Sequence, residues 1–230
     1  YPQLYWRGRV VENSEDKGEA EAPVADDAVA IEGNEGEAGA SENADALPVA
    51  RHQEAVMLTP VERLVAKADG KQRELVENQR GITYFGLFGP YLAGAKKIVV
   101  EDAYVRKPYQ LRNLAEFLEM LLRCKNPDED VAVHLVTGHN EPGFVEAQLN
   151  GLNELASTFS QLGVNLTHEF RDTLHDRSIT ADTGWEILPG RGLDIFQKFV
   201  DGDWLNPLLR HQQLRRVKEC KVTYQRVSEK

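Results

Sequence analysis

The stretch KIVVEDAYV at residues 97–105 is the first of three apolar runs that decide the fold. The second is DVAVHLVT at residues 130–137, and the third is VNLTHEF at residues 164–170, in which apolar side chains alternate with polar ones. Runs of this length, rich in β-branched residues, predict β-strands. The spaces between them are long enough to hold helices, so the three strands form the framework of the chain.

Two amphipathic segments lie between these strands. Leucines recur at helical spacing in residues 109–124, and leucines with a phenylalanine do so in residues 146–162. The order strand, helix, strand, helix, strand favours parallel strands with helices packed on the sheet. Short β-type runs near Ile179, at 185–188 and at 217–224 predict antiparallel additions. We therefore expect an α/β fold with a mixed, largely parallel sheet.

Charge is distributed unevenly along the 230 residues. The net charge is −10, but residues 1–55 hold 13 acidic and 4 basic side chains, whereas residues 56–230 hold 24 and 23. A general nucleic-acid binder carries a basic excess, so this composition argues against that class. No apolar run approaches the roughly 20 residues that a membrane-spanning helix needs. An integral membrane protein is therefore not expected.

Four segments are expected along the chain. Residues 1–11 have the composition of a strand that completes an upstream domain, and residues 12–58 read as an acidic disordered linker because they hold few large apolar side chains. Residues 59–80 form a helical lead-in that starts with Thr-Pro, a favourable N-cap and first helical position. The globular domain covers residues 81–226.

The cysteines and histidines indicate no metal centre or cofactor. Cys124 and Cys220 are far apart and lack the spacing of metal ligands, which favours a reduced, cytoplasmic chain. No two histidines have the i, i+4 spacing of a helical zinc site. The chain starts at Tyr1 without Met and without a signal segment, so we expect it to be the C-terminal piece of a longer protein.

The candidate chemistry lies in TLHDRSITADTGWEILPGRGLDIF at residues 173–196. His175 is followed by Arg177 two positions later and by Asp182 five positions after that. Positions i and i+2 of a strand face the same side, so the imidazole and the guanidinium are expected to point into one pocket. Asp182 is expected past the following turn. The alternative is an ordinary surface strand whose basic side chains pair with neighbouring aspartates.

Four stretches carry a resemblance to a known family: FGPYLAGAKKIVVEDAYVRKPYQLRNLAEFLEML (88–121), HLVTGHNE (134–141), LHDRSITADTGWEILPGRGLD (174–194) and LRRVKECKVTY (214–224). Together they resemble the phospholipase D-like domain at the C-terminus of MIT-domain proteins. The H-x-R-x4-D spacing resembles the H-x-K-x4-D signature of the phospholipase D superfamily, with Arg in place of Lys. The resemblance extends to a bacterial form attached to ATPase, Lon-like or BrxL-type proteins associated with phage defence.

The resemblance implies roles for the motif. In the superfamily a histidine attacks phosphorus, a cation neutralises the phosphoryl oxygens, and a carboxylate orients the imidazole. This chain has one copy of the motif, so catalysis would need a homodimer that brings two His175 side chains together. Arginine in place of lysine suits static phosphate binding. The resemblance therefore implies a non-catalytic module that dimerises and binds acidic phospholipid.

Two alternatives stay open beside the binding module. One is a dimeric phosphodiesterase with His175, Arg177 and Asp182 as catalytic residues, and the other is a structural cap on a larger ATPase-type protein. The family's polar motif corresponds to the following positions: His175, Asp176, Arg177, Gly190, Arg191, Gly192, Asp194, Arg215 and Glu219. We expect His175, Arg177 and Arg191 to form the anion pocket, in a cytoplasmic protein that is peripheral at a membrane.

Two further features have alternative interpretations. Gly190 and Gly192 flank Arg191, so that the backbone can approach a ligand closely or form a β-turn without one. Glu101 and Asp102 end the first long strand and face opposite sides of it, so they cannot easily share a metal ion. We expect one of them to pair with an internal arginine: Arg177, Arg191 or Arg106.

Overall fold

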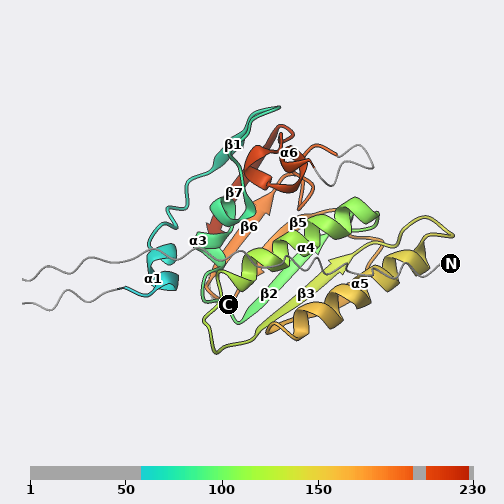
Figure 1. The fold of residues 1–230 in the computed structure, drawn as a ribbon, viewed down its shortest axis with the longest axis horizontal. Coiled ribbons are helices and arrows are strands. Elements are labelled where there is room, and N and C mark those ends of the chain that lie inside the picture. Colours follow the sequence, from blue (N-terminus) through green and yellow to red (C-terminus); the bar gives the residue numbers. More distant parts are fainter. Residues whose placement is uncertain (1–57, 199–205, 228–230) are drawn as a thin grey trace, which may run out of the picture. The chain divides into compact units, whose positions relative to one another are not determined.

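The computed structural model describes residues 58–198 and 206–227. These residues belong to the second of two compact units, Glu54–Lys230 (Figure 1). The first unit, Tyr1–Gln53, lies outside the described residues. The strand and the acidic linker expected within residues 1–57 therefore lie outside them as well.

The described residues form one seven-stranded mixed sheet with the order β1-β7-β6-β5-β2-β3-β4 (Figure 1). The strands are β1 (Arg73–Leu75), β2 (Lys97–Asp102), β3 (Val131–Thr137), β4 (Val164–Phe170), β5 (Arg177–Ala181), β6 (Trp185–Pro189) and β7 (Cys220–Arg226). Strands β2, β3 and β4 run parallel, and every other neighbouring pair is antiparallel. The expected α/β fold with a mixed sheet is confirmed, but the sheet is not largely parallel, because only the β2–β3 and β3–β4 pairs are parallel and the other four pairs are antiparallel.

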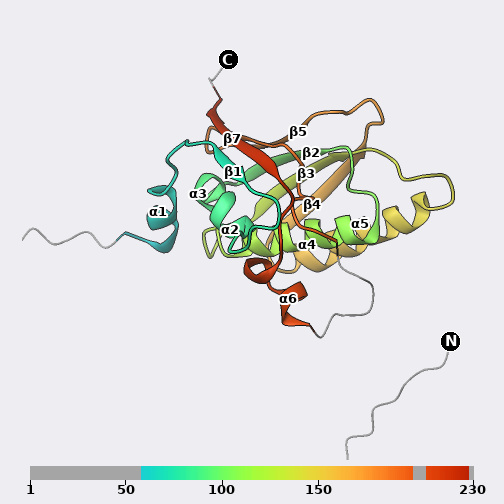
Figure 2. The same ribbon diagram turned by 90° about the horizontal axis from the view of Figure 1, so that it is seen from above.

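Two long helices connect the parallel strands. They are α4 (Pro108–Leu122) and α5 (Val145–Ser160), and both lie on the same side of the sheet (Figure 2). The short helices are α1 (Pro60–Val65), α2 (Tyr84–Leu87), α3 (Gly89–Leu92), α6 (Pro207–Arg210) and the 3-10 helix η1 (Gln212–Leu214). Across residues 58–198 and 206–227, none of the helices combines the length and the apolar character that crossing a membrane requires.

Periodicity explains how the sheet and the helices pack. On β2, Ile98 and Val100 are buried on the side of the helices, whereas Lys97 and Val99 on the other side are exposed. Helix α4 begins with proline at a position where a backbone donor is not needed, and its apolar side chains, including the fully buried Phe117, complete the core. The row of buried β2 residues ends at a charged one, Asp102.

The lead-in differs from its predicted form. Thr59 caps α1 with a capping box to Glu62, as the sequence predicts, but the helix ends at Val65. The helical lead-in expected over residues 59–80 is therefore wrong beyond its first turns, because Arg73–Leu75 is a strand at the edge of the sheet. Three residues are too few for a periodic signal, and their backbone pairs with β7 only in the tertiary structure.

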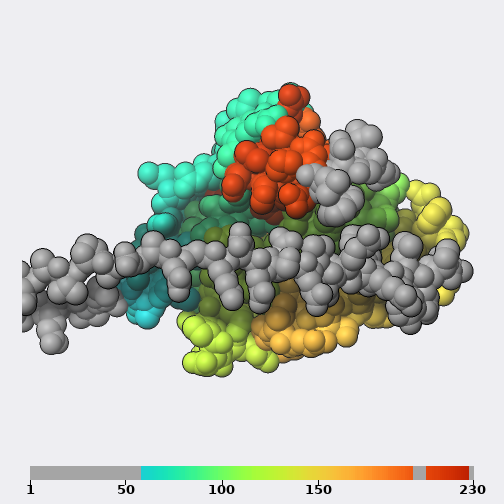
Figure 3. Space-filling model, in the orientation of Figure 1, coloured from blue at the N-terminus to red at the C-terminus, as the bar shows by residue number. Residues whose placement is uncertain are grey.

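The segment that carries α6 and η1 returns to the region after β1. The amide of Gly81 donates to the carbonyl of Gln213 at 2.8 Å, and the amide of Tyr84 donates to the side chain of Gln212 at 2.8 Å. Figure 3 shows these parts, in teal and red, side by side at the surface. The sequence carries no local signal for these short helices, which depend on such distant contacts.

Candidate functional site

The expected motif begins where β5 passes the end of β2. Because β5 is antiparallel to β2, its first residue, Arg177, is the cross-strand partner of the last β2 residue, Asp102. Both side chains lie on the helix side of the sheet, beside the loop that leads into α4 and the turn that follows β6. The carboxyl ends of β2 and β3 meet at this edge, which is the usual place for a binding site in an α/β sheet.

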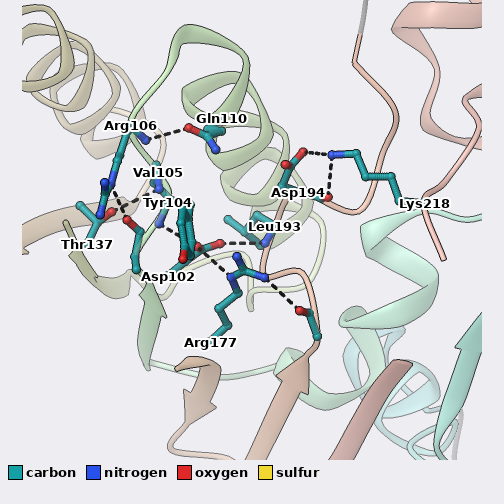
Figure 4. Close-up of polar contacts among 12 residues, drawn as sticks. Asp102, Tyr104, Val105, Arg106, Gln110, Thr137, Arg177, Leu193, Asp194 and Lys218 are labelled. Carbon is teal, nitrogen blue, oxygen red and sulfur yellow. Dashed lines mark hydrogen bonds and ion pairs between the residues drawn. The ribbon is translucent and has the colours of Figure 1, made fainter. Parts of the chain in front are cut away.

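Asp102 is the buried centre of this region (Figure 4). Its carboxylate accepts hydrogen bonds from the amides of Tyr104 and Leu193, both at 3.0 Å, and lies 3.7 Å from Nε of Arg177. Burial raises the pKa of Asp102, while the two amides and the guanidinium act in the opposite direction. The predicted pairing of Glu101 or Asp102 with an internal arginine is confirmed by this contact.

Arg177 is held from several sides but still reaches the surface. Its Nη1 donates to the carbonyl of Gly190 at 2.9 Å, and its guanidinium lies 4.4 Å from the centre of the Tyr104 ring. Its Nε is buried and has no hydrogen-bond partner among the described residues. A quarter of the side chain, 26%, is exposed. The cation is therefore fixed in position with part of its hydrogen-bonding capacity unused.

The Gly-Arg-Gly segment forms a tight turn against Asp102. The amide of Gly192 donates to the carbonyl of Pro189 at 2.8 Å, which closes a β-turn, and Gly190 donates to β7 at 2.9 Å. Gly192 has a φ of +61°, and a Cβ there would lie 1.9 Å from Oδ2 of Asp102. The β-turn interpretation is thus the observed one, and the glycines serve close packing within the protein.

Arg191, which belongs to this turn, and His175 are both exposed. Arg191 donates from Nε to the carbonyl of Glu219 at 2.9 Å. His175 lies in the loop before β5 and has no hydrogen-bond or ion-pair partner among the described residues, and neither has the adjacent Asp176. The structure therefore brings Arg177 and Arg191 to one turn, while the imidazole lies outside it with no carboxylate to orient its ring.

Asp182 is not brought to these residues. Its carboxylate accepts hydrogen bonds from the amides of Lys96 and Lys97, both at 3.1 Å, at the far end of β5. Five residue steps separate it from Arg177, or about 16 Å along an extended strand. The expected catalytic trio of His175, Arg177 and Asp182 is therefore corrected. The whole of β5 lies between Arg177 and Asp182, and the aspartate instead fixes the start of β2.

The other residues expected at a binding site have partners inside the protein. Arg215 is almost fully buried, lies 2.7 Å from the carboxylate of Glu116 and stacks on Phe196 at 4.2 Å, so its expected place at a pocket edge is corrected. Asp194 forms an ion pair with Lys218 at 2.8 Å. These contacts arise because the chain folds back over α4. The spacing of the motif residues in the sequence does not reveal such tertiary contacts.

Tyr104 and Arg106 are the residues that the sequence analysis missed. Tyr104 is 43% exposed, and its ring is flanked by two guanidinium groups, that of Arg177 at 4.4 Å and that of Arg106 at 5.4 Å. A signal for them exists in the sequence, because Tyr104 and Arg106 lie at the carboxyl end of the first predicted parallel strand and GHN follows the second. Residues in these positions gather at one edge of a parallel sheet.

The histidines near this edge contact protein groups. His139 lies 2.9 Å from the carboxylate of Asp172 and stacks on Phe170 at 4.3 Å, and the amide of His139 lowers the pKa of Asp172. His134 lies 2.9 Å from the hydroxyl of Thr167. Within the described part of the chain, no group of three or more His, Cys, Asp or Glu side chains is arranged to hold a metal ion.

Comparison with known proteins identifies relatives of the domain. A family model described as the phospholipase D-like domain at the C-terminus of MIT matches residues 81–226. MIT domain-containing protein 1 of Mus musculus is 38% identical over 136 residues, which make up 57% of this chain and 54% of that protein. The chain thus spans about half the length of this relative.

Proposed function

Because this chain belongs to the family of phospholipase D-like domains found at the C-terminus of MIT proteins, we propose that it binds acidic phospholipid headgroups and does not hydrolyse them. The observation that carries the proposal is the position of Arg177. The buried Asp102, the carbonyl of Gly190 and the ring of Tyr104 hold its guanidinium at the surface. A cation fixed in this way suits an anionic group that binds and leaves unchanged.

Further charged and aromatic side chains at the same edge support a membrane ligand. Arg191 is exposed, and a cation near an anionic membrane contributes about 1 kcal/mol to binding. Tyr104 and Phe144 are also exposed, Phe144 by 59%. Aromatic side chains beside cations suit the boundary between headgroups and acyl chains. The partner we propose is therefore a membrane surface rather than a free phosphate ion.

The state of His175 favours binding over catalysis. A phosphodiesterase of the phospholipase D type needs an imidazole that is oriented for attack and a second imidazole across the phosphate. His175 is exposed and has no partner among the described residues. The carboxylate of the motif, Asp182, bonds to backbone amides at the other end of β5. We therefore propose phosphodiesterase activity only as the second candidate function, after phospholipid binding.

Dimerisation and the host protein are proposals of the same kind. A homodimer would present two copies of the sheet edge that carries Arg177 to one membrane, which strengthens binding through avidity. We propose this arrangement within a larger, ATPase-type protein in the cytoplasm. Analytical ultracentrifugation of the chain tests the dimer, and the sequence before Tyr1 in the full gene tests the host. A structural cap remains the alternative if no ligand binds.

Vesicle sedimentation tests the proposed function. The wild-type chain should sediment with vesicles that contain phosphatidylserine and remain soluble with pure phosphatidylcholine. Arg177→Ala combined with Arg191→Ala should abolish the difference between the two vesicle types. Lys71→Ala removes an exposed cation from the lead-in and serves as the matched control, which should bind like wild type. Equal sedimentation of the wild type with both vesicle types would overturn the proposal.

A further inference from the structure

The loop at residues 103–107, between β2 and α4, is held by side chains to an unusual degree. Each of its amides from residue 104 to residue 107 donates to a buried side-chain oxygen. These bonds are Tyr104 to Asp102 at 3.0 Å, Val105 to Thr137 at 3.2 Å, and Arg106 and Lys107 to Gln110 at 3.2 and 2.8 Å. The acceptors come from β2, β3 and α4, so three elements hold one short loop.

The carbonyls of the loop are held in the same way. Gln148 of α5 donates to the carbonyl of Val105 at 2.8 Å, and Asn140 donates to that of Arg106 at 3.1 Å. Of the seven buried polar or charged side chains in the described residues, four bond to this loop: Asp102, Gln110, Thr137 and Gln148. Burying polar groups costs free energy unless they are fully bonded, and a bonded network makes its surroundings rigid.

This rigid loop presents Tyr104 between two guanidinium groups, as Figure 4 shows. Arg106 donates from Nε to the carbonyl of Ala103 at 2.7 Å and lies against Gly138, where a Cβ would approach its Nη2 to 2.2 Å. Its Nη groups donate to no described residue. Contact with the ring orients both guanidinium groups and partly desolvates them. Their outer N–H groups can then donate hydrogen bonds to an anion.

We infer that Tyr104 and Arg106 contact the phospholipid headgroup together with Arg177. This inference rests on the proposed function and adds the residues that recognise the ligand. Arg106 and Arg177 donate to the phosphate, while the ring of Tyr104 holds both guanidinium groups in place and lies at the headgroup boundary. Asp102, Gln110, Thr137 and Gln148 are positioning residues, because they hold the loop and do not reach the surface.

Vesicle titration of the full chain with phosphatidylserine tests the inference. Arg106→Ala and Tyr104→Leu should each weaken binding about fivefold, which is the effect of one cation or one cation–π contact at such a surface. Tyr104→Phe keeps the ring and should bind within about twofold of wild type. The matched control is Lys107→Ala, the adjacent exposed cation, which lies 3.7 Å from Glu141 and not on the ring. It should weaken binding less than Arg106→Ala does.

The outcomes separate this inference from the proposed function. Equal losses for Lys107→Ala and Arg106→Ala, with no loss for Tyr104→Leu, would mean that net charge alone binds the membrane and would overturn the inference. In that case, loss of binding in Arg177→Ala would still support the proposed function. A wild-type chain that binds no vesicles would overturn both. Thermal unfolding of each variant establishes that a loss of binding does not come from unfolding.

Discussion

Nε of Arg177 lies 3.7 Å from the carboxylate of Asp102, its cross-strand partner at the junction of β2 and β5. The same carboxylate accepts the amide of Leu193, so one buried group fixes both the cation of the candidate site and the turn beside it. Asp102 therefore contributes both to the stability of the fold and to the geometry of the candidate site. Changes at either residue are expected to alter stability and binding together, since loss of Arg177 leaves the buried carboxylate of Asp102 without its cation.

The pH dependence of stability tests which force dominates at Asp102. Burial raises its pKa above the value of about 3.9 in the unfolded chain. Its contribution to stability is therefore fully present below about pH 3.9 and is lost as the pH rises through the folded-state pKa. The unfolding free energy of wild type minus that of Asp102→Asn should fall with rising pH and then level off. A difference that grows with pH would mean that the attraction of Arg177 outweighs burial.

Gly192→Ala should destabilise the protein strongly. The new Cβ would meet Oδ2 of Asp102 at 1.9 Å, and the backbone is left-handed with a φ of +61°. Gly143→Ala is the matched control, since its φ is +90° and nothing lies within 4 Å of its Cβ position. The control should cost about 1–2 kcal/mol, the penalty of the left-handed conformation alone. Urea denaturation should give Gly192→Ala at least twice that loss, and equal losses would contradict the packing described.

Arg215→Met should lower stability and leave vesicle binding unchanged. Removing one partner of a buried ion pair leaves Glu116 uncompensated, at a cost of about 3–5 kcal/mol. The control is Lys96→Met, which breaks an exposed pair with Glu129 and should cost at most about 1 kcal/mol. Chemical denaturation measures both. If folded Arg215→Met loses affinity for acidic vesicles, the arginine belongs to the binding site after all.

Asp182→Ala should have a modest structural effect and no effect on binding. It removes the acceptor for the amides of Lys96 and Lys97, which is worth about 1 kcal/mol of stability. Because Asp182 lies at the far end of β5 from Arg177, sedimentation with acidic vesicles should stay at the wild-type level. Asp176→Ala, an exposed aspartate in the loop near Arg177, is the comparison. A specific loss of binding in Asp182→Ala would restore it to the site.

The sequence predicted the elements whose signals are local and long. Strand β4 has the expected bounds, and α4 and α5 differ from theirs by one or two residues at each end. The internal pairing of Asp102 was also predictable, because a carboxylate that ends a buried strand needs a partner. Short elements such as β1 and α6 were not predictable, since their backbone partners lie far away in the chain.

The candidate site was only partly predictable for the same reason. The spacing of His175 and Arg177 placed them together at the start of β5, but spacing alone could not show that Asp182 lies at its other end. The family resemblance pointed to Arg215, which tertiary packing buries against Glu116. Tyr104 carries no motif, and its importance depends on side chains from several elements that meet only in the folded protein.

The most direct test is recovery of the lipid after binding. The wild-type chain and Arg177→Ala are each incubated with phosphatidylserine vesicles, the bound fraction is isolated, and its lipid is analysed by mass spectrometry. The account predicts intact phosphatidylserine bound to the wild type and little lipid bound to the variant. Hydrolysed lipid that disappears in His175→Ala, or equal amounts of lipid on the wild type and Arg177→Ala, would contradict it.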